Sequence, residues 1–569
     1  MRKILNFQFQ FLSFLFLSGI YSATAQEINR YQERRNNLHH ETIDDAYIPN
    51  AHGNKKVSPG YKLQNFKTSN QSASTIYTTQ VNVNSLGQNI IDDAANEPSI
   101  AINPLDSNDM VIGWRQFDNI ASNFRQAGWS FTTDAGQSWT FPGVIEPGIF
   151  RSDPVLDYDV NGVIYYNSLT NSPSYMCKVF RSSNGGTTWD TGVDAAGGDK
   201  QWMAIDRTAG IGNGNIYSFW STAYSVCPPY QYTRSTDGGN SYNSCSFIDG
   251  DPALGTMVVG NSGELYVAGV SSTSDSLVVA KSLNAQNPGA TLAWNAPSMV
   301  FMDGYLSGFI GVNPVGLLGQ INIDVDRSNG PGQNNVYVLA SITSLLSGDP
   351  ADIIFVRSTD GGLTWSQPMK INDDISTLNT QWFGTMSVAP NGRIDAIWLD
   401  TREDQSGLDS SALYYSYSTD QGVSWSANEK MSALFDPHVG YPNQQKMGDY
   451  FDMESHNDGA HLAWANTLNG EQDVYYSFIV PPVSTAINEI NESLNFTIYP
   501  NPTNGQFKVT DISNVSSIEL YSTMGFKIYS AKDFEKEISI DLSKYASGIY
   551  FLKFVSVNGK FEVKKIIKE

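Results

Sequence analysis

Positive charge is scarce in this sequence of 569 residues, which has 35 lysines and arginines against 57 aspartates and glutamates and a formal net charge of −22. Nucleic-acid binding depends on clusters of cationic side chains that neutralise phosphates. The composition therefore excludes nucleic acid as an expected partner. Charged residues make up only 16% of the chain, while 48 glycines accompany 12% aromatic residues. This combination is typical of short strands joined by many turns, so we expect an all-β protein.

Long apolar runs are also missing, except at the amino terminus. Met1-Arg2-Lys3 precedes an apolar stretch over 4–20, and the small residues Ala23-Thr24-Ala25 follow it. This layout predicts a signal peptide over residues 1–25. Residues 26–70 show no periodicity and are expected to form a flexible leader, which could also fold over the main body. No later segment reaches the roughly 18 apolar residues that a membrane-spanning helix needs, so we expect no transmembrane segment after cleavage.

Cysteine and histidine are few, with three and six in the chain. In an exported protein three cysteines allow one internal disulfide. Cys227 and Cys245 flank one predicted hairpin and are the expected pair. Cys177 is then expected to be a buried free thiol in a strand.

Motifs for metals and cofactors are absent as well. The chain has no HExxH, no Gly-rich phosphate loop and no Cys/His cluster with zinc spacing, and His456 and His461 are expected to be strand residues. Residues 324–330 could hold a structural calcium ion, but they lack a terminal acidic ligand and a plain turn is favoured. We therefore expect no cofactor and no metal ligand among the site residues, with structural calcium as the one option.

An eight-residue pattern, Ser/Thr-x-Asp-x-Gly-x-x-Trp, recurs along the chain. Its copies begin at Thr132, Ser182, Ser235, Ser358 and Ser418. The Asp side chain can accept hydrogen bonds from backbone N–H groups of a turn, the Gly allows a positive φ, and the Trp packs on a sheet. We therefore interpret the aspartates of the pattern as structural.

A second pattern lies between these copies: a strand, a tight turn that often contains glycine, and another strand. Seven such units begin near Glu97, Asp153, Lys200, Asp251, Gln320, Gln381 and Met447. The repeat length is that of one four-stranded sheet, which predicts a β-propeller of four-stranded blades over residues 71–480, with seven blades and six as the alternative. The last unit lacks a fourth strand, and residues 76–83 are expected to supply it and close the ring.

The repeated turns on four-stranded units resemble the Asp-box (BNR) propellers of the sialidase superfamily, over roughly residues 75–480. This resemblance implies a propeller that acts on or binds carbohydrate. Sialidases use arginines on a substrate carboxylate, a tyrosine–carboxylate nucleophile pair and an aspartate acid/base, and Arg115, Arg402, Tyr450 and Asp153 could take such parts. The sequence departs from that family because no Arg-Ile-Pro motif precedes the first copy. A further set of arginines recurs at one repeat position and is expected to be structural: Arg181, Arg234 and Arg357.

The carboxyl-terminal segments LNFTIYPNPTNGQFKV, from Leu494, and GIYFLKFVSVNGKFEVKKIIKE, up to Glu569, resemble the sorting domain of type IX secretion. The resemblance implies a small β-sandwich over 494–569, after a polar linker over 481–493. It also implies the type IX secretion machinery as a partner. The expected location is outside a Gram-negative cell, either released or on its outer surface.

Propeller geometry places the starts of the innermost strands and the loops after the second strands at the same end of the molecule. Acidic side chains and a tyrosine lie near these strand starts, and carboxylates in pairs are what glycoside hydrolysis needs. The candidate catalytic residues are Glu97, Asp153, Asp449 and Tyr450. The candidate substrate-binding residues are Arg115, Lys200, Asp400 and Arg402. The alternative is that these charges pair with one another around a wet channel.

These residues lead to the hypothesis of a sialidase-like glycoside hydrolase that acts on extracellular glycans. A noncatalytic surface propeller that binds glycan or protein is the alternative, and a propeller-type polysaccharide lyase with a base such as His438 is a further one. A purely structural surface protein would be indicated if the leader closed the channel mouth. A deep pocket with two carboxyl groups favours hydrolysis, and a plugged face favours binding.

Overall fold

The computed structural model describes residues 45–48, 55–67, 73–482 and 496–569, apart from short gaps at 173, 223, 272–275, 346, 406, 408, 513–514, 524–526, 533–535 and 557–560. The signal peptide predicted over 1–25 and almost all of the predicted linker lie outside the described residues. The chain divides into two units, Met1–Pro482 and Val483–Glu569. Within the described residues no helix has the length and apolar character to cross a membrane.

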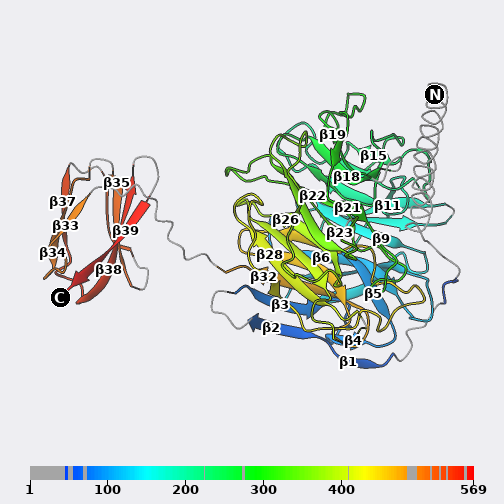
Figure 1. Ribbon diagram of the computed structural model, residues 1–569, viewed down its shortest axis with the longest axis horizontal. Helices are drawn as coiled ribbons and strands as arrows, with labels where there is room; N and C mark the ends of the chain where they lie inside the picture. The colour runs from blue at the N-terminus through cyan, green and yellow to red at the C-terminus, as the bar shows by residue number, and fades with distance from the viewer. Residues whose placement is uncertain are drawn as a thin grey trace, which may run out of the picture. The chain divides into compact units, whose positions relative to one another are not determined.

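The first unit is built from antiparallel sheets, each made mainly of strands that are consecutive in the chain (Figure 1). Blades 1 to 3 contain β5 (Ala94–Ile102), β6 (Met110–Phe117), β7 (Gln126–Thr132) and β8 (Thr140–Ile145); β9 (Ser152–Tyr158), β10 (Ile164–Thr170), β11 (Met176–Ser182) and β12 (Val193–Asp194); and β13 (Trp202–Ile205), β14 (Ile216–Phe219) and β15 (Tyr232–Ser235).

Blades 4 to 6 follow in the same order, and blades 4 and 5 each have two short strands on the second strand's inner edge. They contain β16 (Pro252–Ala253), β17 (Met257–Val259), β18 (Leu265–Ser271), β19 (Leu277–Ser282) and β20 (Ser298–Val300); β21 (Gly304–Leu306), β22 (Asn322–Val325), β23 (Val336–Ser344), β24 (Asp352–Ser358) and β25 (Met369–Lys370); and β26 (Gln381–Val388), β27 (Ile394–Asp400), β28 (Ala412–Ser418) and β29 (Glu429–Lys430).

Blade 7 joins the two ends of the propeller. Its strands are β30 (Asp452–Ser455), β31 (Ala460–Asn466) and β32 (Asp473–Val480), followed by β3 (Thr75–Gln80) and β2 (Lys62–Lys67) from the start of the chain. β3 pairs with β32 with Thr75 opposite Val480, so the predicted closing strand is confirmed. The innermost strands contact one another in the order β5, β9, β13, β17, β22, β26, β30 and again β5, which gives a closed ring of seven blades.

The region predicted to be a flexible leader, residues 26–70, contains two strands in its described part. β2 adds a fifth strand to blade 7, and β1 (Val57–Pro59) pairs with β4 (Gln88–Ile90). The expectation of flexibility is therefore wrong for these segments, because backbone pairing with the closing blade satisfies their N–H and C=O groups. Residues 45–48 also contact the body of the propeller, where Asn123 donates its backbone N–H to Asp45 at 2.6 Å.

The repeated eight-residue turns have the local geometry that their residue types predict. In the turn that starts at Ser358, the hydroxyl donates to Asp360 at 2.7 Å, and Gly362 N–H donates to the Ser358 hydroxyl at 2.8 Å. Asp360 also accepts the backbone N–H of Thr364 at 2.9 Å. The hydroxyl of Thr364, which donates to Asp360 at 2.5 Å, and the backbone N–H of Thr364 are the main causes that lower the pKa of Asp360 to about 2. The Asp360 carboxylate therefore accepts hydrogen bonds from residues of its own turn, which is a structural role.

The arginines that recur at one repeat position connect neighbouring blades. Arg181 donates to the carbonyl of Gly238 at 3.2 Å, and Arg357 donates to the carbonyl of Gln421 at 3.2 Å. Both acceptors lie in the repeated turn of the following blade. Arg234 does the same with the carbonyl of Ala285. Their structural role is thus confirmed by the contacts.

The second unit is a small β-sandwich. One sheet has the order β33 (Thr497–Tyr499), β34 (Gln506–Thr510) and β37 (Glu537–Asp541), and the other has the order β36 (Lys527–Lys532), β35 (Val515–Ser522), β38 (Gly548–Ser556) and β39 (Phe561–Lys568). Alternate residues of the strands are buried, as at Phe507 and Val509 in β34 and at Leu552 and Phe554 in β38. These side chains form one core cluster, as two facing sheets require.

Two carboxyl groups are buried where the ring closes. Asp473 accepts a hydrogen bond from Asn82 at 2.7 Å, and Asp93 accepts one from Gln116 at 3.0 Å. Burial raises the pKa of Asp93 to about 7, and burial together with the charge of Asp93 raises the pKa of Asp473 well above its usual value. Both groups are therefore easier to ionise in the unfolded chain than in the folded protein.

The raised pKa values of Asp93 and Asp473 are expected to make the propeller less stable as pH rises. A carboxyl group whose pKa is raised by folding stabilises the folded protein fully at pH values below its pKa in the unfolded chain. This stabilisation decreases as the pH rises further, until the pH reaches the pKa in the folded protein. We expect calorimetry to show a loss of about 1.4 kcal/mol per pH unit for each group between about pH 5 and 7. The substitution Asp473→Asn should reduce this slope. Asp360→Asn is the control, because the lowered pKa of Asp360 affects stability only in strong acid; an equal change in both variants would contradict the assignment.

Candidate functional site

Each blade has a residue with a positive φ at the start of its innermost strand. The φ angles are 50° at Glu97, 49° at Asp153, 57° at Lys200, 61° at Leu254, 125° at Gly319, 55° at Phe383 and 107° at Gly448. In blades 1, 2 and 6 the strand register shifts at this point, which is a β-bulge. A bulge redirects a side chain, and the left-handed backbone costs roughly 1–2 kcal/mol at a non-glycine residue. The fold thus maintains a strained position in blades 1 to 4 and 6.

Charged side chains from these strand starts and from neighbouring segments meet in what we call the central cluster: Glu97, Arg115, Asp153, Asp199, Lys200, Lys446 and Asp449. Lys446 Nζ lies 3.2 Å from Glu97 Oε1 and 2.5 Å from Asp449 Oδ2, so two carboxylates share one ammonium group. Lys200 Nζ lies 2.8 Å from Asp449 Oδ2 and 3.0 Å from Asp199 Oδ1.

Arg115 and Asp153 complete this arrangement. Arg115 Nε lies 3.1 Å from Glu97 Oε2, and the backbone N–H of Lys200 donates to Asp153 at 3.1 Å. Gly448 is required beside them, because a Cβ atom there would lie 2.6 Å from Glu97 Cγ. The structure therefore brings together five of the eight predicted residues, which come from blades 7, 1, 2 and 3: Glu97, Arg115, Asp153, Lys200 and Asp449.

The central cluster separates the pKa values of its two paired carboxyl groups. Burial raises the pKa of Glu97 to about 7, although Arg115 and Lys446 oppose this effect. Burial alone would also raise the pKa of Asp449, but the positive charges of Lys200 and Lys446 hold it well below its usual value. Burial would lower the pKa of Lys200, and the charges of Asp199 and Asp449 instead raise it well above its usual value. Glu97 is thus the member that can carry a proton near neutral pH.

Two loops cover the central cluster. In the loop before β30, Gln444 accepts a hydrogen bond from Arg115 at 3.1 Å and the carbonyl of Lys446 accepts one from Asn96 at 3.3 Å. In the loop before β22, Asn313 donates to the carbonyl of Gly448 at 2.8 Å. Leu317 N–H of the same loop donates to Asp449 at 2.8 Å.

Solvent does not reach the members of the central cluster. Glu97, Arg115, Asp153 and Asp199 have an exposed fraction of 0%, and Lys200, Lys446 and Asp449 have at most 2%. The predicted alternative, that charges at the strand starts pair with one another, agrees with these contacts, but the charged side chains are buried and do not line a solvent-exposed channel.

Tyr450 is close to the central cluster but is engaged elsewhere. Its hydroxyl donates to the carbonyl of Pro154 at 2.7 Å, and its ring makes an edge contact with Trp202 at 5.3 Å between centroids. Burial raises the pKa of Tyr450 well above its usual value. The phenol is therefore neutral, and within the described residues its hydroxyl donates to a backbone carbonyl and not to a carboxylate that would activate it as a nucleophile.

Asp400 and Arg402 do not join the other predicted residues. Asp400 accepts hydrogen bonds from Trp398 at 2.9 Å and from Arg402 at 2.9 Å, and Arg402 also pairs with Asp373. The equivalent tryptophan of blade 1, Trp114, donates to Gln116 in the same way at 2.7 Å.

This equivalence explains why the comparison of repeats misplaced Asp400. Asp400 corresponds to Gln116 and not to Arg115. The predicted residues Arg115 and Asp400 therefore occupy positions of the second strand that differ by one residue. A shift of one residue in a strand turns the side chain to the opposite face. The role of Asp400 and Arg402 in the same site is therefore corrected, and they form a separate ion pair in blade 6.

Lys446 was not among the predicted residues, although it contacts both Glu97 and Asp449. It lies in the long loop before β30, where neither repeat pattern applies. The only sequence signal is its place directly before Met447, the predicted start of the seventh unit. Asp199 had a similar signal, because it precedes Lys200.

Residues 324–330, for which the sequence favours a plain turn over a calcium loop, form a turn whose first carboxylate accepts hydrogen bonds from the protein. Asp324 accepts from Arg327 at 2.9 Å and from the backbone N–H of Val388 at 2.8 Å. Asp326 accepts the backbone N–H of Ser328 at 2.8 Å. These contacts are those of a plain turn.

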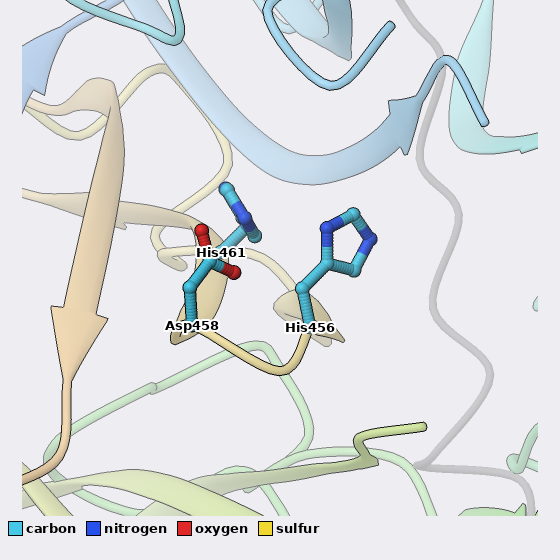
Figure 2. A group of neighbouring side chains, drawn as sticks. All are labelled: His456, Asp458 and His461. Carbon is cyan, nitrogen blue, oxygen red and sulfur yellow. The ribbon is translucent and has the colours of Figure 1, made fainter. Parts of the chain in front are cut away.

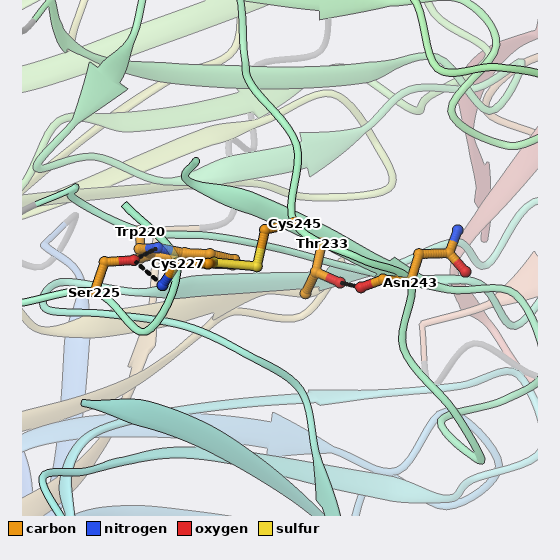
Figure 3. The surroundings of a disulfide bond; sticks show 6 residues. All are labelled: Trp220, Ser225, Cys227, Thr233, Asn243 and Cys245. Carbon is orange, nitrogen blue, oxygen red and sulfur yellow. Dashed lines mark hydrogen bonds between the residues drawn. A yellow bond between two sulfur atoms is a disulfide. The ribbon is translucent and has the colours of Figure 1, made fainter. Parts of the chain in front are cut away.

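Exposed aromatic residues lie close in the sequence to the two cysteines of the blade 3 disulfide, whose surroundings are drawn in Figure 3. Cys227 and Cys245 are bonded and Cys177 is a buried free thiol, which confirms both predictions. The most exposed aromatic side chains in the described propeller are Tyr224 at 38%, Tyr230 at 40%, Phe247 at 52% and Phe301 at 62%. The first three flank the disulfide.

We call Tyr175, Tyr224, Tyr230 and Phe247 the aromatic platform. Tyr230 and Phe247 lie 4.6 Å apart between ring centroids, and Tyr175 and Tyr224 lie 4.9 Å apart. Tyr175, Tyr224 and Tyr230 belong to loops that follow second strands, and Phe247 follows Ser246, which pairs with Tyr232 at the start of β15. The aromatic platform is therefore at the same end of the propeller as the central cluster.

The loop of the aromatic platform is held from both sides. Trp220 Nε1 donates to the hydroxyl of Ser225 at 2.8 Å, and the same hydroxyl accepts the N–H of Cys227 at 3.2 Å (Figure 3). On the other side of the disulfide, the hydroxyl of Thr233 donates to the carbonyl of Asn243 at 2.7 Å. The rings are thus presented on a preorganised surface.

A closed seven-bladed propeller with a dry, ion-paired centre, followed by a separate β-sandwich, defines the class of this protein: an exported two-unit β-protein. The second unit matches the family described as "Secretion system C-terminal sorting domain", over residues 497–569. The protein is therefore exported by the type IX system of Bacteroidetes to the cell surface or the extracellular space. No curated protein has a match to the sequence.

Solved structures to which this chain is similar include three proteins of different description. A protein of unknown function from Dyadobacter fermentans is 14% identical over 71% of this chain and 98% of its own, with a TM-score of 0.40. The Hadza microbial sialidase Hz136 is 12% identical over 67% and 65%, with a TM-score of 0.35. The α-L-arabinofuranosidase Arb93A of Fusarium graminearum is 13% identical over 49% and 92%, with a TM-score of 0.30. At these values the similarities assign no activity, and the fold rests on the strand pairing itself.

Proposed function

We propose that this protein is a noncatalytic surface propeller that binds a neutral polysaccharide on the aromatic platform. The observation that carries the proposal is the location of the exposed aromatic rings: three of the four most exposed ones surround a single disulfide-braced loop. Scattered exposed apolar side chains are normal, but a cluster on a rigid loop marks a binding surface. The dry central cluster under its two loops supports binding over hydrolysis.

The chemistry of the aromatic platform suits sugar rings without charge. A tyrosine or phenylalanine face can stack on the apolar C–H face of a sugar, while polar groups at the rim reach its hydroxyls. The segments 220–233 and 243–251 contain no lysine or arginine but include Asp249 and Asp251. A sialylated or uronic acid polymer would meet the negative charge of these two aspartates, so a neutral glycan is favoured. The disulfide reduces the entropy lost when the loop binds.

A glycoside hydrolase is the second candidate function. It is favoured by the difference between the pKa values of two carboxyl groups in the central cluster. Glu97 has a pKa raised to about 7, whereas that of Asp449 is lowered, and carboxyl groups with separated pKa values are how such enzymes assign acid and base roles. This function would require the loops that carry Asn313 and Gln444 to open, because they cover both carboxylates.

One experiment separates these two functions. The purified protein is titrated with neutral and acidic polysaccharides, and the release of reducing sugar is measured in the same samples. We expect neutral polymers to bind without release, and Tyr230→Ala and Phe247→Ala each to weaken binding by about fivefold, which corresponds to roughly 1 kcal/mol for one aromatic contact. The control is Leu363→Ala, an exposed apolar side chain in a repeated turn at the other end of the propeller.

Two results would overturn the proposal. Binding that is unchanged in both aromatic variants would remove the aromatic platform as the site. Sugar release that is lost in Glu97→Gln but kept in Tyr230→Ala would instead establish the hydrolase and place its chemistry at the central cluster.

A further inference from the structure

We propose that the turn between β30 and β31 binds a divalent transition-metal ion, of the Zn²⁺ class, through His456, Asp458 and His461. One ligand atom from each of these residues lies within 4.8 Å of the other two. Figure 2 shows the three side chains on the same side of the turn. The turn is at the end of blade 7 opposite the central cluster, because β30 begins beside Asp449 and runs away from it.

The hairpin register brings the two histidines together across five residues of sequence. Ser455 pairs with Ala460, and Glu454 pairs with His461, so residues 456–459 form the connection. The backbone N–H of His456 donates to the carbonyl of Gly459 at 2.8 Å and closes this turn. This closure fixes the spacing of the ligands along the turn.

Each imidazole is held by an outer partner on one nitrogen and keeps the other for a metal ion. His456 Nε2 lies 3.2 Å from Glu454 Oε1, which leaves Nδ1. His461 Nδ1 lies 2.8 Å from the hydroxyl of Tyr476, which leaves Nε2. A carboxylate or hydroxyl behind a ligating histidine is the usual arrangement around protein-bound metals, because it fixes the ring and its tautomer.

An unpartnered buried atom points to a missing ligand. His461 is 5% exposed, and its Nε2 has no hydrogen-bond partner among the described residues. A buried polar atom without a partner costs about 1–3 kcal/mol, and coordination of a metal ion would remove that cost. The ring of His456 lies 4.9 Å from that of His461 between centroids.

Arg393 holds the turn in place from the neighbouring blade. Its guanidinium donates to the carbonyl of His456 at 2.7 Å and to that of Asn457 at 3.2 Å. The charge of Arg393 is balanced by Asp395 at 2.8 Å. The ligand set is therefore supported by a rigid backbone, as a preformed metal site requires.

The donor set selects the kind of metal. Two imidazole nitrogens and one carboxylate oxygen suit Zn²⁺ and related first-row ions, whereas Ca²⁺ and Mg²⁺ prefer oxygen ligands alone. Three protein ligands leave one position of a tetrahedral ion for water or for a group from another molecule. The bound ion would clamp the hairpin of the blade that closes the ring.

The test is a calorimetric titration of the signal-free full chain with ZnCl₂, using protein purified without a polyhistidine tag. We expect one saturable site, and a weakening of at least about tenfold in Asp458→Asn and in His456→Gln, since loss of even an outer partner costs 10–100-fold. Asp458 is exposed, so Asp458→Asn should fold normally, which circular dichroism checks. At the same Zn²⁺ concentration the unfolding temperature should also rise more in the wild type than in the two variants.

The matched control is the double variant His39→Gln/His40→Gln, which removes the adjacent histidines near the amino terminus. It should leave the affinity and the thermal shift unchanged. Equal affinity in the wild type and in Asp458→Asn, loss of binding in the His39/His40 variant, tighter binding of Ca²⁺ than of Zn²⁺, or no saturable binding would each overturn the proposal.

Discussion

Removal of residues 483–569 is expected to abolish export of the propeller across the outer membrane in a host with type IX secretion. The sorting domain lies within this segment, over residues 497–569. The segment forms its own compact unit, and the propeller has separate core clusters, so the truncated protein should still fold. Immunoblots of cell fractions should show the truncated protein in the periplasm and the full chain on the surface or in the medium.

The control for this truncation is the reverse transfer. Residues 483–569 fused to an unrelated periplasmic protein should carry that protein out of the cell. Truncated protein that still reaches the surface in the full amount would show that the propeller contains a second export signal.

The substitution Lys200→Met in the central cluster is expected to cause a large loss of stability. Lys200 contacts two carboxylates, at 3.0 Å in Asp199 and 2.8 Å in Asp449, and it is 2% exposed. Removal of one partner from a buried ion pair leaves uncompensated charge in a dry environment and costs about 3–5 kcal/mol. Urea unfolding followed by tryptophan fluorescence measures this difference.

Lys430→Met is the matched control, because Lys430 forms a partly exposed ion pair with Glu403. An exposed pair is worth at most about 1 kcal/mol. If Lys200→Met cost no more than this control, water would have to reach the central cluster. Such a result would weaken the binding proposal and strengthen hydrolysis.

The parts of the fold that depend on local chemistry could be predicted from the sequence. The repeated turns follow from the hydrogen bonds of residues such as Ser358 and Asp360, which are close in the chain. The closing strand followed from alternation over residues 76–83 and from the missing strand of the last unit. The pairing of Cys227 with Cys245 followed from their places on one hairpin.

The site was predicted only where the repeat itself sets the position. Glu97, Asp153 and Lys200 occupy the same place in three blades, and the repeat therefore located all of them. Lys446 contacts two of the carboxylates from a long loop without periodicity, so no pattern indicated it. The sequence also did not determine the register at the end of a strand. The predicted alignment of Asp400 was wrong by one residue, so Asp400 does not lie in the central cluster.

The proposed metal site in the turn between β30 and β31 was not predicted from the sequence, for a related reason. His456 and His461 were expected to be strand residues, and their separation does not match a zinc motif. His461 does lie in β31, but His456 lies in the turn, and the hairpin register brings the two rings together. Side chains that meet across a hairpin depend on pairing, which a motif search along the chain does not examine.

The positive-φ position that all seven blades share has a consequence for how this propeller could acquire new chemistry. Leu254 and Phe383 already occupy the same left-handed backbone position as Glu97, Asp153 and Lys200. A mutation there changes the side chain presented to the centre without a new loop or a new backbone path. Evolution or design could therefore alter the function of the molecule one blade at a time, while the other blades preserve the closed ring.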